Sequence, residues 1–88
     1  MSQMPVKFRI LQAINQNKEL SNQELLEILK KEYPLDRCVN GEGIDNCLLS
    51  LKTGGMIKLT QAVEDSNGKL KLYYKITDYG MNRMKYIY

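Results

Sequence analysis

The stretch over residues 41–76 changes its hydrophobic period half-way, and this change most constrains the fold. Apolar residues first recur at intervals of three and four, which lines one side of an α-helix. These residues are Ile44, Cys47, Leu48 and Leu51. Gly54-Gly55 then favours a helix end, because glycine readily adopts the backbone conformation found there. Beyond it the period falls to two, which is typical of strands. We therefore expect a helix over about 43–53 and a two-stranded hairpin over 56–76.

Asn67-Gly68 predicts where this hairpin turns. Both residues tolerate the positive φ of a type I′ turn, and Asn-Gly is the strongest short-range hairpin signal. With these two as the turn, Ser66 faces Lys69, and a four-residue loop keeps the same register. The pairs expected on one face are Val63–Leu72, Gln61–Tyr74 and Leu59–Ile76, and those on the other are Glu64–Lys71, Ala62–Tyr73 and Thr60–Lys75.

Capping signals predict three further helices. Pro5 suits a first helical turn, so a helix is expected over about 5–15. Ser21-Asn22-Gln23-Glu24 is a capping box that opens a helix over 22–32, and Pro34 ends it. Thr77 is expected to cap a last helix over about 78–87.

The long polar connection over residues 34–43 joins the second helix to the third. It contains two apolar residues, Leu35 and Val39, and we expect both to pack onto the core. Its polar residues Arg37, Asn40 and Glu42 are expected to face solvent.

Length and composition indicate one globular domain over residues 1–88, because 43% of the residues are apolar and 26% are charged. No apolar run approaches the roughly 20 residues of a membrane span. The first residues also lack the apolar region of a signal peptide. We therefore expect a cytoplasmic protein that does not enter a membrane.

Charge is distributed unevenly along the chain. Residues 1–51 carry six Lys/Arg and seven Asp/Glu, a net charge of −1, whereas residues 52–88 carry seven and three, a net charge of +4. Such an asymmetry favours an anionic partner for the C-terminal half. An ordinary solubilising surface is the alternative.

Enzyme chemistry has little support in this composition. Histidine, the commonest general base, is absent. Cys38 and Cys47 are expected to be free thiols, since cytosolic disulfides are rare, and structural zinc sites seldom use carboxylates in place of histidine. We therefore predict no catalytic residues, no metal site and no cofactor.

The C-terminal segment is unusually apolar. Its apolar residues are Tyr79, Met81, Met84, Tyr86, Ile87 and Tyr88. A short terminal helix cannot hide apolar groups on every side against one small domain, and exposed patches usually mark interfaces. We expect a homodimer contact through Tyr79, Met84, Tyr86, Ile87 and Tyr88, with packing into the chain's own core as the alternative.

Three segments resemble PadR-like and MarR-like transcriptional regulators. The end of their recognition helix is similar to residues 44–57, a leucine-spaced helix closed by glycine and followed by Met56-Ile57. The Leu-Thr-x-x-Gly-x-x-x-Leu signature after their wing is similar to residues 76–84, Ile-Thr-Asp-Tyr-Gly-Met-Asn-Arg-Met. The start of their second helix resembles Ser21-Asn22-Gln23-Glu24-Leu25.

The resemblance covers about residues 6–84 and implies a winged helix-turn-helix domain of the α+β class. This fold has a three-helix core, a two-stranded wing and a short C-terminal helix. The connection before the third helix is longer than the usual tight turn. The third helix is also poor in cations, which would give weak or narrowly specific recognition.

The resemblance implies sequence-dependent binding of double-stranded DNA. The third helix would place Asn46, Ser50, Lys52 and Thr53 in the major groove. On the wing, Lys69, Lys71, Tyr73 and Lys75 alternate on one face and would contact the backbone or minor groove. Ser21 and Asn22, at a helix N-terminus, would hold a phosphate. The alternative is a winged-helix module that binds protein and not DNA, because a fold does not fix a function.

Overall fold

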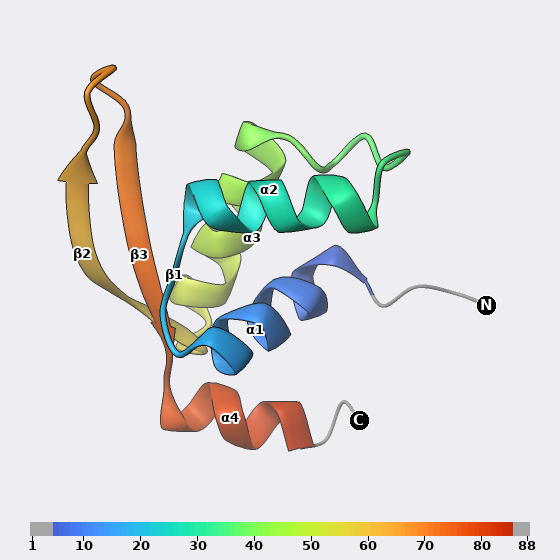
Figure 1. The fold of residues 1–88 in the computed structure, drawn as a ribbon. Coiled ribbons are helices and arrows are strands. Elements are labelled where there is room, and N and C mark those ends of the chain that lie inside the picture. Colours follow the sequence, from blue (N-terminus) through green and yellow to red (C-terminus); the bar gives the residue numbers. More distant parts are fainter. Residues whose placement is uncertain (1–4, 86–88) are drawn as a thin grey trace.

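The computed structural model describes residues 5–85 and shows a winged helix (Figure 1). The elements in chain order are α1 (Val6–Asn17), β1 (Leu20–Ser21), α2 (Asn22–Glu32), α3 (Gly41–Thr53), β2 (Ile57–Glu64), β3 (Leu70–Ile76) and α4 (Asp78–Lys85). Helices α1 to α3 gather beside the sheet, and the β2–β3 hairpin projects beyond them as the wing. The predicted α+β winged helix-turn-helix fold is confirmed. Within residues 5–85, no helix has the length and apolar character needed to cross a lipid bilayer.

The sheet has three strands, where the sequence predicted only two. Its order is β1-β3-β2, and both neighbouring pairs are antiparallel. Leu20 and Ser21 form β1 and pair with Tyr74 and Tyr73 of β3. A two-residue strand is too short to show an alternating pattern in the sequence.

The core lies between the three helices and the base of the sheet. Its buried apolar residues are Ile10, Leu11, Ala13, Ile14, Leu20, Leu25, Leu29, Tyr33, Val39, Ile44, Leu48, Leu51, Ile57, Tyr74 and Met84. Burial of each large aliphatic side chain in this core stabilises the folded state by about 1.5–3 kcal/mol.

The connection between α2 and α3 is fixed at two points. Tyr33 and Val39 are both buried, as was expected for Val39. Leu35, however, is 95% exposed, so its predicted place in the core is wrong. Backbone bonds from Asp36 N–H to the Tyr33 carbonyl and from Val39 N–H to the Asp36 carbonyl turn the chain outward between the anchors. This leaves Leu35 on the outside of the arch.

The predicted register of the hairpin is wrong by one residue at the tip. Glu64 pairs with Leu70, and only Gly68 of the turn has a positive φ, so the turn is not type I′. The observed pairs are Ile57–Ile76, Lys58–Lys75, Leu59–Tyr74, Gln61–Tyr73, Ala62–Leu72, Val63–Lys71 and Glu64–Leu70. A bulge at Thr60, between Leu59 and Gln61, shifts the ladder once more.

The carboxylate of Asp65 explains this turn. The Asp65 carbonyl accepts the Gly68 N–H at 3.0 Å, and the Asp65 N–H donates to the Lys69 carbonyl at 2.8 Å. The side-chain Oδ1 accepts the N–H groups of Asn67 and Lys69, each at 2.9 Å. These bonds favour a three-residue loop with a left-handed glycine at its end over the two-residue Asn-Gly turn.

The base of the wing closes against α4 through Thr77. Its N–H donates to the Met56 carbonyl at 2.9 Å, and its hydroxyl donates to the Gly55 carbonyl at 2.6 Å. The same hydroxyl accepts the Gly80 N–H at 3.0 Å and so caps α4. A side chain at Gly80 would overlap the Met56 carbonyl oxygen. The Thr-x-x-Gly spacing therefore has a steric reason.

We predict that Gly80→Ala lowers the free energy of unfolding by about 1–3 kcal/mol, as overpacking does. The new Cβ would also lie 2.9 Å from Ile76 Cγ1. Gly41→Ala is the matched control, because a Cβ there meets nothing within 4 Å. Denaturant unfolding measures the free energy of unfolding of both variants. Equal stability of the two variants would contradict the close approach, since alanine by itself favours a helix over glycine.

Candidate nucleic-acid interface

Helix α3 uses one face for the core and leaves the other open. Ile44, Leu48 and Leu51 are buried. The exposed residues on the remaining faces are Asp45, Asn46, Leu49, Ser50, Lys52 and Thr53. Asn46, Ser50 and Thr53 follow one another at intervals of four and three, so they lie along one side of the helix. Three of the four predicted groove-facing residues therefore share one side of α3, whereas Lys52, two positions after Ser50, lies on the opposite side of the helix.

The N-terminus of α3 is fixed by a cap and by close packing. Asn40 Oδ1 accepts the Gly43 N–H at 2.8 Å. A side chain at Gly43 would overlap the Cys38 carbonyl oxygen, so the long connection packs tightly on the first turn of the helix. The extra length of this connection is therefore accommodated without loosening α3.

Lys7 of α1 is a basic residue that sequence analysis did not assign to the interface. Its Nζ donates to Ser50 Oγ at 2.8 Å, across 43 residues of sequence. This contact adds a positive charge to the exposed face of α3. The Ser50 hydroxyl accepts this bond and keeps its own proton to donate elsewhere. No local pattern could have paired two residues so far apart.

The four wing residues predicted to contact DNA do not form one uniform strip. Lys75 lies directly opposite Lys58, because the observed register differs from the predicted one. Like charges opposite each other on a sheet destabilise it. An anion placed near Lys58 and Lys75 would relieve that repulsion, so this pair is the best candidate on the wing for a phosphate contact.

Lys71 has closer partners within the chain. Its ammonium lies 5.5 Å from the centre of the Tyr73 ring. Hydrogen bonding with Tyr73 raises the pKa of Lys71, and the carboxylates of Glu24 and Glu27 on α2 act in the same direction. Its positive charge is therefore partly balanced before any ligand arrives.

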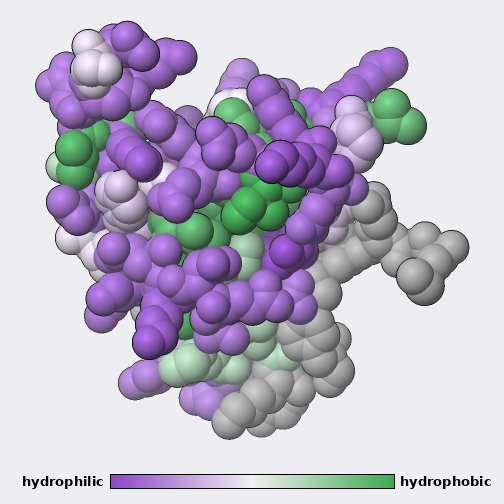
Figure 2. Space-filling model, in the orientation of Figure 1, coloured by the Kyte–Doolittle hydropathy of each residue, from purple (hydrophilic) through white to green (hydrophobic). Residues whose placement is uncertain are grey.

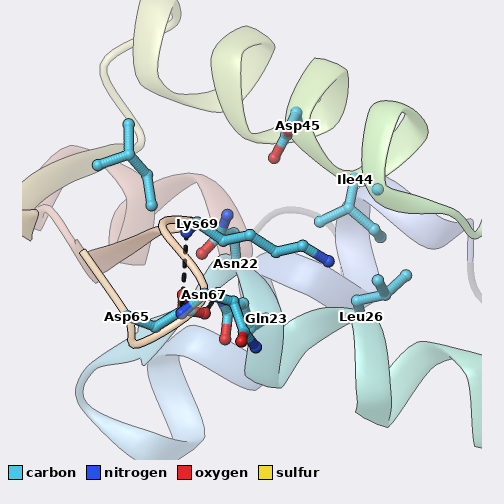
Figure 3. Close-up of a pocket in the computed structure, with 10 residues that line it drawn as sticks. Asn22, Gln23, Leu26, Ile44, Asp45, Asp65, Asn67 and Lys69 are labelled. Carbon is cyan, nitrogen blue, oxygen red and sulfur yellow. Dashed lines mark hydrogen bonds between the residues drawn. The ribbon is translucent and has the colours of Figure 1, made fainter. Parts of the chain in front are cut away.

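Lys69 lies at the tip of the wing and extends toward α2 and α3 (Figure 3). It lines a cleft between the turn and the first turns of both helices. Its side chain therefore belongs to a different environment from those of Lys71 and Lys75. Figure 2 shows that the face containing the wing is largely hydrophilic, with hydrophobic surface between the wing and the helices.

Ser21 and Asn22 are occupied by structural contacts. Ser21 is fully buried, and its hydroxyl bonds the N–H and the carboxylate of Glu24 in the predicted capping box. The predicted phosphate contact was through free N–H groups, but the Ser21 N–H is buried and already donates to the Glu24 carboxylate at 3.3 Å, so this role is corrected for Ser21. Asn22 Oδ1 accepts the Leu72 N–H at 3.0 Å and joins α2 to β3.

Asp65 also links the wing tip to α2. Its Oδ2 accepts a bond from Gln23 Nε2 at 3.3 Å, in addition to the two turn bonds on Oδ1. The backbone bond from Lys69 is the main reason why the pKa of Asp65 is lowered, and the bonds from Asn67 and Gln23 add to it. Asn22 and Asp65 together hold β3 and the turn against the start of α2.

The predicted dimer residues divide into three groups. Tyr79 is 53% exposed and is available for a contact. Met84 is buried in the core of its own chain, so its predicted place in a dimer interface is corrected. Tyr86, Ile87 and Tyr88 lie outside the described residues.

Residues 5–85 contain no group of three or more Cys, Asp or Glu side chains arranged to hold a metal ion. Both cysteines are free thiols. Burial raises the pKa of the Cys47 thiol, which favours its protonated, less reactive form.

Three solved structures share this fold. A PadR-like transcriptional regulator from Bacillus cereus is 27% identical, with a TM-score of 0.69 over 91% of this chain and 74% of that one. A proposed transcriptional regulator from Thermoplasma acidophilum is 18% identical, with a TM-score of 0.71 over 90% and 72%. Bacillus subtilis PadR in complex with operator DNA is 22% identical, with a TM-score of 0.72, over 91% of this chain but 44% of that one.

The likeness to the Bacillus cereus protein confirms the resemblance to PadR-like transcriptional regulators. The Thermoplasma acidophilum and Bacillus subtilis structures are less than 25% identical and show a shared fold alone. No protein-family model matches the sequence, and no curated protein matches it either. The chain spans less than half of the PadR that was solved with operator DNA.

We predict that the wing tip loosens in acid because of Asp65. Its pKa is lowered in the folded protein, so its stabilising effect is present above about pH 4 and is lost as the pH falls through the lowered pKa. NMR of the Asn67 and Lys69 amide groups during an acid titration measures this change. Asp65→Asn is the control, because its amide oxygen can accept the two turn bonds from Asn67 and Lys69 and does not titrate, although its amide nitrogen cannot accept the Gln23 bond. A wild-type tip that is insensitive to acid would refute the prediction.

Proposed function

We propose that this chain binds double-stranded DNA in a sequence-dependent manner and acts as a small transcriptional regulator in the cytoplasm. The observation that carries the proposal is the exposed face of α3, which presents Asn46, Ser50 and Thr53 away from the core beside a projecting wing. The 27% identity to a PadR-like regulator over most of both chains supports it. Because Bacillus subtilis PadR was solved in complex with operator DNA, duplex DNA is the ligand to test.

In this proposal α3 enters the major groove. Asn46 is the best candidate for reading a base, because an asparagine amide can bond adenine with a donor and an acceptor at once. Ser50 and Thr53 are hydroxyls that accept or donate, so they tolerate several bases. Lys7 and Lys52 would contact the phosphates that border the groove.

The wing then contacts the backbone or the minor groove. Lys58 and Lys75 form its most basic point, since they lie opposite each other without a carboxylate partner at salt-bridge distance within residues 5–85. Lys69, Lys71 and Tyr73 extend the surface toward the tip. Neutralising phosphates releases counterions, so this part of the binding should depend strongly on salt.

The first test removes the paired lysines. We expect Lys58→Ala with Lys75→Ala to weaken binding to a mixed pool of duplex DNA, measured by fluorescence anisotropy. The slope of log affinity against log salt should fall by about two, because each lysine would neutralise one phosphate. Lys30→Ala with Lys31→Ala is the matched control, because it removes two exposed charges from the far end of α2. Equal weakening in both variants would indicate a general charge effect, and no binding at low salt would refute the proposal.

The second arm of this experiment tests base reading. After site selection from a random pool, Asn46→Ala should cost about 1–3 kcal/mol on the selected site and much less on mixed DNA. Asn15→Ala, at an exposed position of α1, should leave the affinity for both DNAs unchanged. An equal reduction of affinity on both DNAs would assign Asn46 to the backbone and not to a base.

Protein binding is the second candidate function, and Leu49 favours it. This leucine is 61% exposed on the outer side of α3, where Glu42 and Asp45 add negative charge. An apolar group flanked by acids suits a protein partner better than a phosphate backbone. Failure to bind DNA at low salt would select this candidate.

We also propose a homodimer through the C-terminal segment, with Tyr79 in the contact. Tyr79 and Met81 are 53% and 41% exposed on α4, a helix whose other side covers the core with Met84. Tyr79→Ser should lower the fraction of dimer measured by light scattering, while Asn82→Ser, at a neighbouring exposed position, should leave it unchanged. A monomeric mass for the unaltered protein would refute this contact.

A further inference from the structure

A cleft of about 400 Å³ lies between the tip of the wing and the first turns of α2 and α3 (Figure 3). This volume falls in the range of small-molecule sites, about 300–1,000 Å³. Its apolar lining comes from all three elements: Leu26 of α2, Ile44 of α3 and Leu70 of β3. A ligand here would touch the wing and the third helix at once.

Two opposite charges face this cleft without meeting each other. The Asp45 carboxylate points in from α3, and the Lys69 side chain extends across from the wing. They form no ion pair with each other, and within residues 5–85 neither side chain makes a hydrogen bond. Each therefore keeps its hydrogen-bonding capacity for an external group, while the Asp65 carboxylate also attracts the charge of Lys69.

The neighbouring Asp65 has less capacity to spare, although its Oδ2 accepts only one bond. Its carboxylate already accepts three bonds, from the Asn67 and Lys69 backbones and from Gln23. Asn22 lines the cleft and is partly available: its side-chain oxygen accepts the Leu72 N–H, and its amide nitrogen donates to no described group. The free groups are thus one anion, one cation and one amide donor around an apolar floor.

We propose that this cleft binds a small zwitterion with an apolar side group, of the free α-amino acid class. The ammonium group pairs with Asp45, and the carboxylate pairs with Lys69 and accepts from the Asn22 amide. The side group lies against Leu26, Ile44 and Leu70. Both charges of the ligand are required, because each is matched by one unpaired charge of the protein.

This binding has a consequence for DNA that rests on the proposed function. A ligand held by both Asp45 and Lys69 joins the wing tip to α3 and fixes the angle between the two DNA-contacting parts. It also occupies Lys69, which the DNA backbone would otherwise use. We expect the ligand to change DNA affinity, since it interacts differently with the free and DNA-bound states.

Titration of the isotope-labelled protein with L-leucine and L-phenylalanine, without DNA, tests the site. We expect saturable amide shifts at Asp45, Lys69 and Leu70. Leucinamide lacks the carboxylate and 4-methylpentanoate lacks the ammonium, so each should bind at least about tenfold more weakly than leucine. Absence of saturation with both amino acids, or equal binding of the two analogues and leucine, would overturn the proposal.

Paired variants assign the two charges. Asp45→Asn should abolish the difference in affinity between leucine and 4-methylpentanoate, and Lys69→Gln should abolish that between leucine and leucinamide, because each variant lacks the partner of one ligand charge. Glu27→Gln and Lys30→Gln are the matched controls at exposed positions of α2. Loss of discrimination in the controls as well would overturn the assignment to this cleft.

Anisotropy of labelled DNA with and without leucine separates the two proposals. Leucine binding with a change in DNA affinity supports both. If the protein binds leucine but does not bind DNA, the proposed site is supported and the proposed function is refuted. DNA binding without saturable leucine shifts refutes the site and keeps the function.

Discussion

The backbone around Met56 is the point on which the rest of the structure depends. The Met56 N–H donates to the Leu51 carbonyl at the end of α3, and the Met56 carbonyl accepts the Thr77 N–H after β3. Gly80 brings α4 against the same carbonyl. The third helix, both strands of the wing and the last helix thus meet within one residue. Main-chain hydrogen bonds, the Thr77 hydroxyl and the close approach of Gly80 together hold their relative orientation.

Much of the helical layer could be predicted from the sequence, because its signals are local. The capping box at Ser21 and the apolar period around Leu48 each depend on residues within one or two turns. The exposed side of α3 follows from the same period, so Asn46, Ser50 and Thr53 could be placed from the sequence alone. The Thr-x-x-Gly pattern after the wing is likewise short, although its steric reason appears only in three dimensions.

The features that sequence analysis missed all depend on distant partners or on competing local bonds. The strand β1 exists because Leu20 and Ser21 meet β3 more than 50 residues later. The hairpin register was wrong because the Asp65 carboxylate, two residues before Asn67, directs the turn that Asn-Gly alone would not choose. Lys7 on Ser50 and the unpaired charges of Asp45 and Lys69 arise only when separate elements pack together.

The bulge at Thr60 affects how two molecules can meet. Strand β2 is the edge of the sheet, and an edge strand offers unpaired backbone groups to any other strand. One extra residue breaks the regular spacing of those groups in the middle of the strand, and the charged side chain of Lys58 adds repulsion between like copies. Sheet-to-sheet polymerisation through the wing is therefore disfavoured. The projecting hairpin can stay long and solvent-exposed without seeding fibrils, and self-association is left to other surfaces of the molecule.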